Sequence, residues 1–203
     1  MGDFVEVKAG VMSLTRNKLV NGVGINDSWY FTERVIDGKR VSCPYYARWS
    51  AMLSRCYSKA YQLNQPTYVG CSVCDEWLVF SNFKMWMEKQ DWKGKHLDKD
   101  ILVQGNKVYS PETCIFVTRS INNLLNDSGR TRGLTRQGVS FEVDRNKYRA
   151  SICINGRKKF LGYFADEQSA FKTYKKAKYE IINGIAKNQA EPLRSALLKY
   201  KIK

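Results

Sequence analysis

The spacing of apolar residues in the first half of the chain predicts helices. Within residues 45–57, apolar side chains recur at three- and four-residue intervals, which is typical of a helix with one buried face. These side chains are Tyr45, Trp49, Met52, Leu53 and Cys56. Pro44 precedes them at a position that suits the first turn of a helix. A second aromatic stripe predicts another helix over residues 75–90.

Alternation of apolar and polar residues replaces these intervals after residue 135. Residues 139–143 and 148–154 alternate, and 160–164 form a third apolar run, which together predict three antiparallel strands. Asn155-Gly156, between the second and third runs, is a hairpin signal. Asp166 is expected to cap a helix that ends near Gly184.

These patterns predict an α+β protein with more than one module. An Asp37-Gly38 step between β-rich runs predicts a hairpin near the N-terminus, and Pro192 begins a short C-terminal helix. The expected boundaries are 1–40 for an N-terminal extension that packs on the next domain, 41–128 for a first domain, 129–134 for a linker, 135–186 for a second domain and 187–203 for a basic C-terminal helix.

The net charge of the chain indicates which class of molecule it binds. The chain has 203 residues and a formal net charge of +15, with a pI near 9.6. Residues 130–203 carry 18 Lys and Arg against 6 Asp and Glu, whereas residues 1–129 carry 16 against 13. A basic field of this kind indicates a polyanion partner and belongs to the C-terminal part. The sequence contains no run of about 18 apolar residues and no signal peptide, so no membrane association and a cytoplasmic location are expected.

The six cysteines are expected to be reduced thiols in such a compartment. Cys71 and Cys74 have zinc-knuckle spacing, but a structural zinc site needs four ligands and the chain has no second pair of this kind. Buried or half-buried thiols are therefore favoured over a zinc site.

The stretch 95–123 carries the residues best suited to chemistry. It contains the only histidine of the chain, His96, and a tight acidic pair, Asp98 and Asp100. A Gly-Asn turn signal and a helix start at Ser110-Pro111-Glu112 follow, so the stretch is predicted to fold as strand, turn and short helix.

The stretch contains the motifs His96-Leu97-Asp98-Lys99, Gly105-Asn106 and Cys114-Ile115-Phe116-Val117, with Val73-Cys74-Asp75-Glu76-Trp77 before them. In these motifs it resembles the ββα-metal site of the HNH endonucleases of bacteriophages, and the resemblance covers roughly residues 41–128. The resemblance implies phosphodiester hydrolysis with one divalent ion, Asp98 as a metal ligand and Thr113 near the position of the helix asparagine. Lys99 stands where the family has its general-base histidine, and a lysine with an ordinary pKa of about 10.4 is protonated at neutral pH.

Strand geometry offers a site that does not depend on Lys99. In an extended strand His96, Asp98 and Asp100 point to one face and Lys99 to the other. The predicted catalytic residues are therefore His96, Asp98 and Asp100, and the predicted ligands of Mg²⁺ or Mn²⁺ are Asp98, Asp100 and an amide from Asn106 or Asn122. The alternative is that the aspartates cap turns and pair with nearby basic residues, while His96 is a solvated surface residue.

Residues 135–186 contain four further motifs: Gly138-Val139, Tyr148-x-Ala150, Phe160-Leu161-Gly162-Tyr163-Phe164 and a helix start near Ser169-Ala170. In these motifs the region resembles the DNA-binding domain of plant ethylene-response factors and its phage relatives. The resemblance implies a three-stranded sheet whose outer face lies in the major groove. Ser140 and Cys153 stand where the plant domains present arginine to bases, so a different or weaker sequence preference is expected.

The basic residues of this region are predicted to contact double-stranded DNA. Base readout is expected mainly from Arg149 and backbone contacts from the other cations, which makes affinity fall steeply with salt. For the two arginines of the linker, contact with DNA and ordinary solvation both remain open. The predicted DNA-binding residues are Arg130, Arg132, Arg136, Arg145, Lys147, Arg149, Arg157, Lys158 and Lys159.

Two functions follow from this sequence. The first is a phage-type DNA endonuclease of the homing kind, which nicks or cuts duplex DNA with Mg²⁺ or Mn²⁺. The second is a DNA-binding regulator or blocker built on a degenerate HNH scaffold without its chemistry. An RNA-binding protein would share the charge, but the predicted sheet argues against it.

Overall fold

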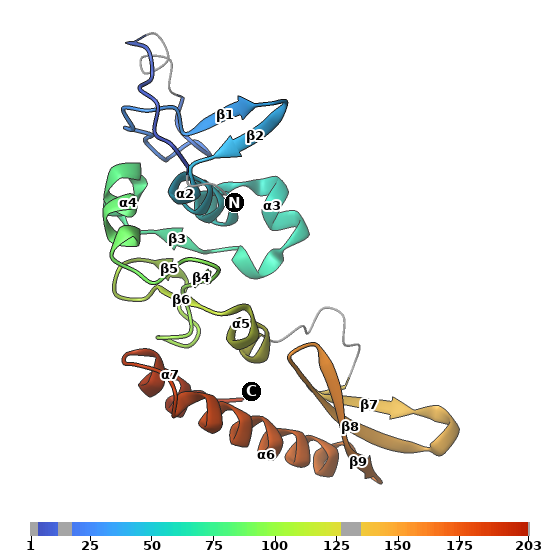
Figure 1. Ribbon diagram of the computed structural model, residues 1–203. Helices are drawn as coiled ribbons and strands as arrows, with labels where there is room; N and C mark the ends of the chain where they lie inside the picture. Colours follow the sequence, from blue (N-terminus) through green and yellow to red (C-terminus); the bar gives the residue numbers. More distant parts are fainter. Residues whose placement is uncertain (1–3, 12–17, 127–134, 203) are drawn as a thin grey trace. The chain divides into compact units, whose positions relative to one another are not determined.

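The computed structural model describes residues 4–11, 18–126 and 135–202, and the chain divides into two compact units (Figure 1). The first unit is residues 1–116 and the second is residues 117–203. Both helices and strands occur along the chain, so the predicted α+β class is confirmed. No helix of the described residues is long and apolar enough to cross a membrane.

The N-terminal hairpin has the predicted turn. Strands β1 (Glu33–Ile36) and β2 (Lys39–Ser42) pair antiparallel. Asp37 and Gly38 both have positive φ, at 50° and 72°, which is the conformation that a two-residue hairpin loop of this type requires.

The first predicted helix forms as α2 (Pro44–Tyr57), with Pro44 in its first turn, and α3 (Lys59–Asn64) follows it. The second does not run unbroken from 75 to 90. A 3₁₀ turn, η2 (Asp75–Leu78), is separated from α4 (Phe80–Glu88) by the extended residue Val79. Ile25 causes this break, because its N–H donates to the carbonyl of Leu78 and its carbonyl accepts the N–H of Phe80, at 2.7 and 3.0 Å.

The core of the first unit is aromatic. Trp49, Trp77, Phe80 and Phe83 are fully buried, and the indole Nε1 of Trp49 donates to the carbonyl of Trp77 at 2.7 Å. Tyr30 belongs to the same core. The N-terminal segment and the two helices therefore share one hydrophobic cluster in which α2 and α4 contact each other.

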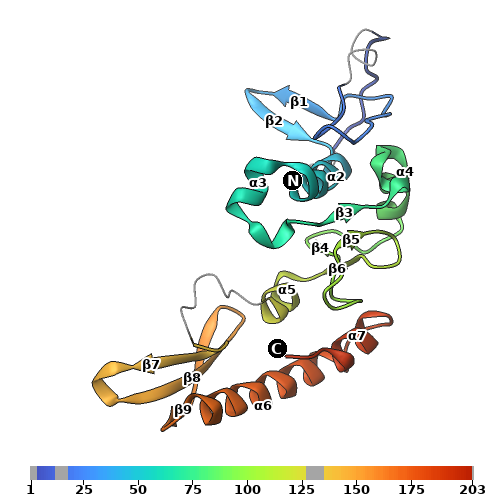
Figure 2. The same ribbon diagram turned by 180° about the vertical axis from the view of Figure 1, so that it is seen from behind.

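Four short strands complete this region of the chain, and Figure 2 labels each of them. β3 (Ser72–Val73) pairs in parallel with β5 (Val108–Tyr109), and β4 (His96–Asp98) pairs with β6 (Ile115–Val117).

The helix expected at Ser110 is absent, and the prediction was wrong there. Cys114 donates its N–H to the carbonyl of Ser110 at 3.0 Å and the hydroxyl of Thr113 donates to the carbonyl of Val108 at 2.8 Å, so the chain makes a single turn and enters β6. The helix begins later, as α5 (Arg119–Leu125), where the Thr118 hydroxyl accepts the N–H of Ile121.

α5 belongs to the second unit. Leu124 packs against the second core, and the Tyr200 hydroxyl donates to the carbonyl of Leu125 at 2.7 Å. The division between the two units falls before α5. The predicted linker, residues 129–134, lies outside the described residues.

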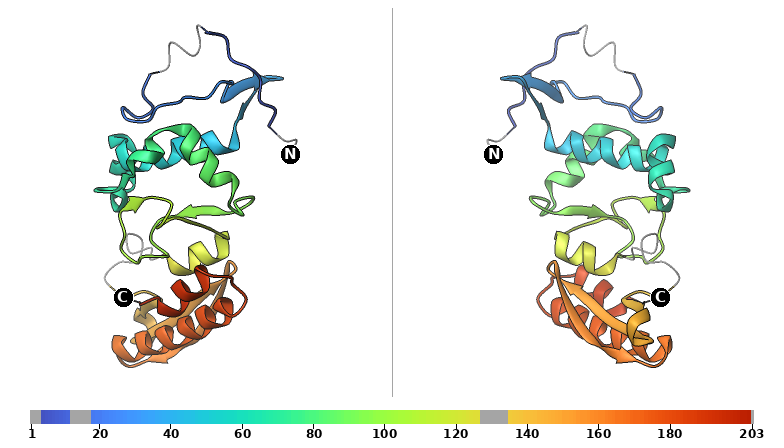
Figure 3. Two further views of the ribbon diagram at one scale, coloured as in Figure 1. Left: turned by 90° about the vertical axis from the view of Figure 1, so that its left-hand side faces the viewer. Right: turned by 90° about the vertical axis from the view of Figure 1, so that its right-hand side faces the viewer.

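The second unit has two layers. Strands β7 (Val139–Glu142), β8 (Lys147–Ile154) and β9 (Arg157–Phe164) form an antiparallel sheet in this order, and helix α6 (Glu167–Ala186) lies against one face of it (Figure 3). The Asp166 carboxylate caps α6 by accepting the N–H of Ser169, as predicted, and the helix continues through Gly184. α7 (Leu193–Lys199) packs on α6.

Candidate functional site

The side of the sheet that does not meet α6 is called the outer face here. Val139, Ala150 and Ile152 are buried in the core beneath α6, so the residues that alternate with them point to the opposite side. Cross-strand partners share a face, which extends the set to all three strands. The outer-face residues are Ser140, Glu142, Lys147, Arg149, Ser151, Cys153, Lys158, Phe160 and Tyr163.

A β-bulge brings two aromatic rings together on this face. Residues three apart on a regular strand point to opposite sides, but the register shifts so that Ser151 pairs with Phe160 while Arg149 pairs with Tyr163. The rings of Phe160 and Tyr163 consequently lie with centroids 5.0 Å apart. Their residues are 50% and 38% exposed, so the pair presents apolar surface to solvent.

Two arginines cover this aromatic pair. The guanidinium carbon of Arg145 lies 5.0 Å from the ring centroid of Tyr163, and that of Arg149 lies 5.7 Å from the centroid of Phe160. Lys147 and Lys158, both exposed, add charge on the same face. A surface on which basic side chains alternate with aromatic rings can bind phosphates through its cations and nucleic-acid bases through its rings.

The other predicted DNA-binding residues lie apart from this cluster. Arg136 stacks on Phe171 of α6, with its guanidinium carbon 5.2 Å from the ring centroid. Arg157 and Lys159 are exposed in β9 but pair with Ile154 and Ile152, which places them on the side of the sheet that faces α6. The predicted residues Arg130 and Arg132 lie outside the described residues.

Sequence reasoning missed Phe160 and Tyr163 as surface residues. The signal that points to them is Gly162, an isolated glycine inside a strand pattern, which commonly marks a bulge. Its φ of 141° is one that other residues rarely adopt.

In the first unit, Asp98 caps a turn at the end of β4. Its Oδ1 accepts the backbone N–H groups of Asp100 and Ile101 at 2.8 and 2.9 Å. Burial and then the neighbouring Asp100 carboxylate raise the pKa of Asp98 to about 6. The strand ends at Asp98, so the alternation that was expected to carry Asp100 onto the same face stops before it.

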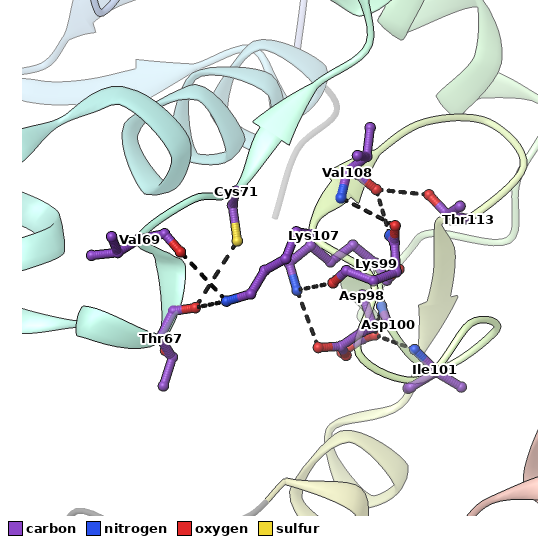
Figure 4. A network of polar contacts seen from close by, with 11 residues as sticks. Thr67, Val69, Cys71, Asp98, Lys99, Asp100, Ile101, Lys107, Val108 and Thr113 are labelled. Atoms are coloured by element: carbon purple, nitrogen blue, oxygen red, sulfur yellow. Dashed lines mark hydrogen bonds and ion pairs between the residues drawn. The ribbon is translucent and has the colours of Figure 1, made fainter.

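Lys99 was expected to point away from the acidic residues, but its side chain is hydrogen-bonded to one of them (Figure 4). The residue is 7% exposed, and its Nζ donates to Oδ2 of Asp100 at 3.1 Å and to the carbonyl of Asn106 at 3.0 Å. Burial alone lowers the pKa of Lys99, but the Asp100 charge and hydrogen bond outweigh burial and leave it raised. Lys99 therefore lies in the structure as a hydrogen-bond donor to Asp100 and Asn106, and its raised pKa favours the charged form.

The remaining predicted residues surround this turn. Asn106 uses its amide to brace the loop, since Nδ2 donates to the carbonyls of Lys99 and Val108 at 2.7 and 2.6 Å. His96 is exposed at the start of β4, two residues from Asp98 across the buried Leu97. Among the described residues, no group of three or more His, Cys, Asp or Glu side chains is arranged to hold a metal ion.

The cysteine pair of zinc-knuckle spacing consists of free thiols. Cys71 is buried and Cys74 half-buried, and they flank β3. Burial raises the pKa of Cys74, so its protonated form is favoured.

Comparisons of the chain with protein-family models, with curated proteins and with solved structures give no match.

Proposed function

We propose that the chain is a DNA-binding protein that docks the outer face of its three-stranded sheet on duplex DNA. The observation that carries the proposal is the exposed Phe160–Tyr163 pair covered by Arg145 and Arg149. A two- or three-stranded surface fits the major groove, where arginine donates to base edges and lysines at the margin meet phosphates. The excess of basic residues in the C-terminal part supplies the long-range attraction.

Salt dependence of binding tests this proposal. Fluorescence anisotropy of a labelled 30-base-pair duplex is measured from low to physiological salt for the intact chain. Each phosphate contact contributes about 0.9 to the slope of log affinity against log salt. The double variant Lys147→Gln/Lys158→Gln is therefore expected to lower the slope by roughly 2.

A matched control exists on the other layer of the unit. Lys172 and Lys176 are exposed on α6, whose buried side faces the sheet. The variant Lys172→Gln/Lys176→Gln removes the same charge and should leave the slope nearly unchanged. Equal effects of both double variants, or no salt-dependent binding by the wild type, would overturn the proposal.

The second candidate function is HNH-type, metal-dependent hydrolysis of the same DNA by the first unit. The observation that favours it is the proximity of the Asp98 and Asp100 carboxylates beside the exposed His96, because hard divalent ions prefer carboxylate oxygens. In this proposal His96 acts as the base, while Asp98, Asp100 and Asn106 hold Mg²⁺ or Mn²⁺. Against it stands the Lys99 ammonium on Asp100, which favours a degenerate scaffold serving as a regulator or blocker.

Nicking of supercoiled plasmid in Mg²⁺ or Mn²⁺ distinguishes these alternatives. The variants are His96→Ala and Asp98→Asn, the second of which keeps an oxygen that accepts the turn N–H groups. Metal-dependent nicking that both variants abolish supports hydrolysis. No nicking by a wild-type protein that binds the same plasmid leaves DNA binding as the whole function.

A further inference from the structure

The outer face carries a single carboxylate among the outward positions of its three strands, and that carboxylate contacts an arginine. Oε1 of Glu142 lies 3.5 Å from a terminal nitrogen of Arg149, and the Ser140 hydroxyl donates to the same oxygen at 3.4 Å. Both partners of the ion pair are about one-third exposed, at 34% for Arg149 and 36% for Glu142. A solvent-exposed ion pair of this kind adds little to the free energy of unfolding, so stability alone does not account for the contact between Glu142 and Arg149.

Two neighbouring side chains, Phe160 and Glu142, orient the Arg149 side chain. Its guanidinium lies over Phe160, one terminal nitrogen meets Glu142, and its Nε is buried with no hydrogen-bond partner in the described part of the chain. A buried N–H without an acceptor is unfavourable, so the contacts with Phe160 and Glu142 must hold the side chain in this conformation. With Nε buried, the two terminal nitrogens are the ones left to donate a pair of parallel hydrogen bonds.

We infer that Glu142 is a specificity-determining residue, which positions Arg149 and makes the outer face require a G·C base pair where the two meet DNA. The inference rests on the proposed DNA binding. In the major groove guanine presents two acceptors, N7 and O6, and the paired cytosine presents the N4 amino donor beside them. Arg149 matches the guanine acceptors and Glu142 matches the cytosine donor.

The same pair rejects the alternatives. An A·T pair presents an adenine amino donor toward the arginine and the thymine O4 acceptor toward the carboxylate. A donor then faces a donor and an acceptor faces an acceptor, so neither side chain can form its hydrogen bond. A phosphate in place of a base is repelled by Glu142. Glu142 therefore weakens nonspecific binding, and this loss is recovered only where the N4 amino group of cytosine donates a hydrogen bond to its carboxylate.

Selection from a pool of duplexes with randomised central positions tests the inference. The wild type is expected to enrich a fixed G·C pair at one position. Glu142→Gln, which keeps the shape but not the charge, should raise affinity for unselected duplex several-fold at low salt and lower the preference for the enriched site by about ten-fold. Arg149→Lys should lose the preference as well, because a single ammonium cannot donate the paired hydrogen bonds.

Two controls separate positioning from charge. The swap Glu142→Arg/Arg149→Glu preserves net charge and an ion pair, so it should keep overall affinity and lose the G·C preference. Lys158→Gln should weaken binding to all sequences alike and leave the preference intact.

The outcomes distinguish this inference from the function on which it rests. A wild type that binds no duplex overturns the proposed function itself. Binding with a G·C preference that survives Glu142→Gln, or with no preference at this face, overturns the role of Glu142 alone.

Discussion

The rings of Phe160 and Tyr163 lie 5.0 Å apart on one face of β9, although the residues are three positions apart in a strand. Gly162 makes this possible, because its φ of 141° accompanies a register shift that leaves the adjacent Leu161 without a cross-strand partner. A Cβ at this position would also lie 3.1 Å from the ring of Phe164. The outer face thus depends on a glycine that pairs with Ala150 on the opposite side of the sheet.

Gly162→Ala is expected to destabilise the second unit by about 1–3 kcal/mol, the cost of holding a non-glycine residue in a rare backbone conformation. Denaturant unfolding of the full chain measures this. Gly184→Ala is the matched control: it lies inside α6 with open space around it, so it should stabilise the helix by about 0.5–1 kcal/mol. Equal effects of the two substitutions would show that the bulge does not depend on glycine.

Lys99→Met is expected to lower the free energy of unfolding by about 1–3 kcal/mol. The substitution removes a buried donor and leaves the carbonyl of Asn106 without it. The coupling between Lys99 and Asp100 in a double-mutant cycle with Asp100→Asn should stay below about 1 kcal/mol, because Asp100 is 46% exposed.

Lys107→Met provides the comparison for Lys99. The Lys107 Nζ also donates to backbone carbonyls, those of Thr67 at 2.7 Å and Val69 at 3.5 Å, but its side chain is exposed and water can replace it. Its loss should cost clearly less than that of Lys99. A larger loss for Lys107 would contradict the importance of burial.

Local signals in the sequence predicted the elements that have local causes. The hairpins at Asp37-Gly38 and Asn155-Gly156 follow from residues that adopt positive φ, and Pro44 and Asp166 begin their helices as capping rules indicate. The strand order of the second unit followed from alternation because one face of that sheet is buried.

The predictions that were wrong concern places where contacts between residues far apart in the sequence, or irregular backbone geometry, determine the structure. The break at Val79 is made by Ile25, which no pattern within residues 75–90 can indicate. Alternation through 96–100 assumed a longer strand, whereas the Asp98 side chain ends it by accepting two N–H groups. The outer aromatic pair was hidden because a bulge reverses the alternation after Phe160. Composition could not show that Glu142, rather than another residue, would meet Arg149.

The stability of the first unit should depend on pH through Asp98. Its pKa in the folded chain is raised to about 6, mainly by burial, whereas an unfolded aspartate titrates near 3.9. Between about pH 4 and 6 the folded chain therefore binds more protons than the unfolded chain, and the free energy of unfolding contributed by Asp98 falls as pH rises through this window.

Asp98→Asn removes this contribution while its amide oxygen can still accept the N–H groups of Asp100 and Ile101. Urea unfolding from pH 4 to 8 should show a shallower decline for the variant than for the wild type. Asp144→Asn makes the same chemical change at an exposed turn residue and serves as the control. A difference between wild type and Asp98→Asn that is constant across this range would contradict the raised pKa.

The six cysteines are expected to differ in how fast their thiols react with a disulfide reagent. Burial raises the pKa of both Cys56 and Cys114 to about 12, so at pH 8 only about one in ten thousand of these thiols is the reactive thiolate. Cys153 is exposed. A chromogenic disulfide reagent at pH 8 should therefore modify Cys153 quickly, the half-buried Cys74 more slowly and the four buried thiols only after unfolding. Cys153→Ser should lose the fast phase.

Cys153 also reports on the outer face. It pairs with Lys158 across the strands and points to the side that carries Arg149 and Phe160. Saturating duplex DNA at low salt is expected to slow modification of Cys153 at least several-fold, because the bound duplex covers the thiol. The double variant Lys147→Gln/Lys158→Gln should lose this protection at salt concentrations where the wild type retains it. Fast modification of Cys153 in a complex shown by anisotropy to be saturated would mean that DNA binds elsewhere on the protein, and would redirect the search to other basic surfaces.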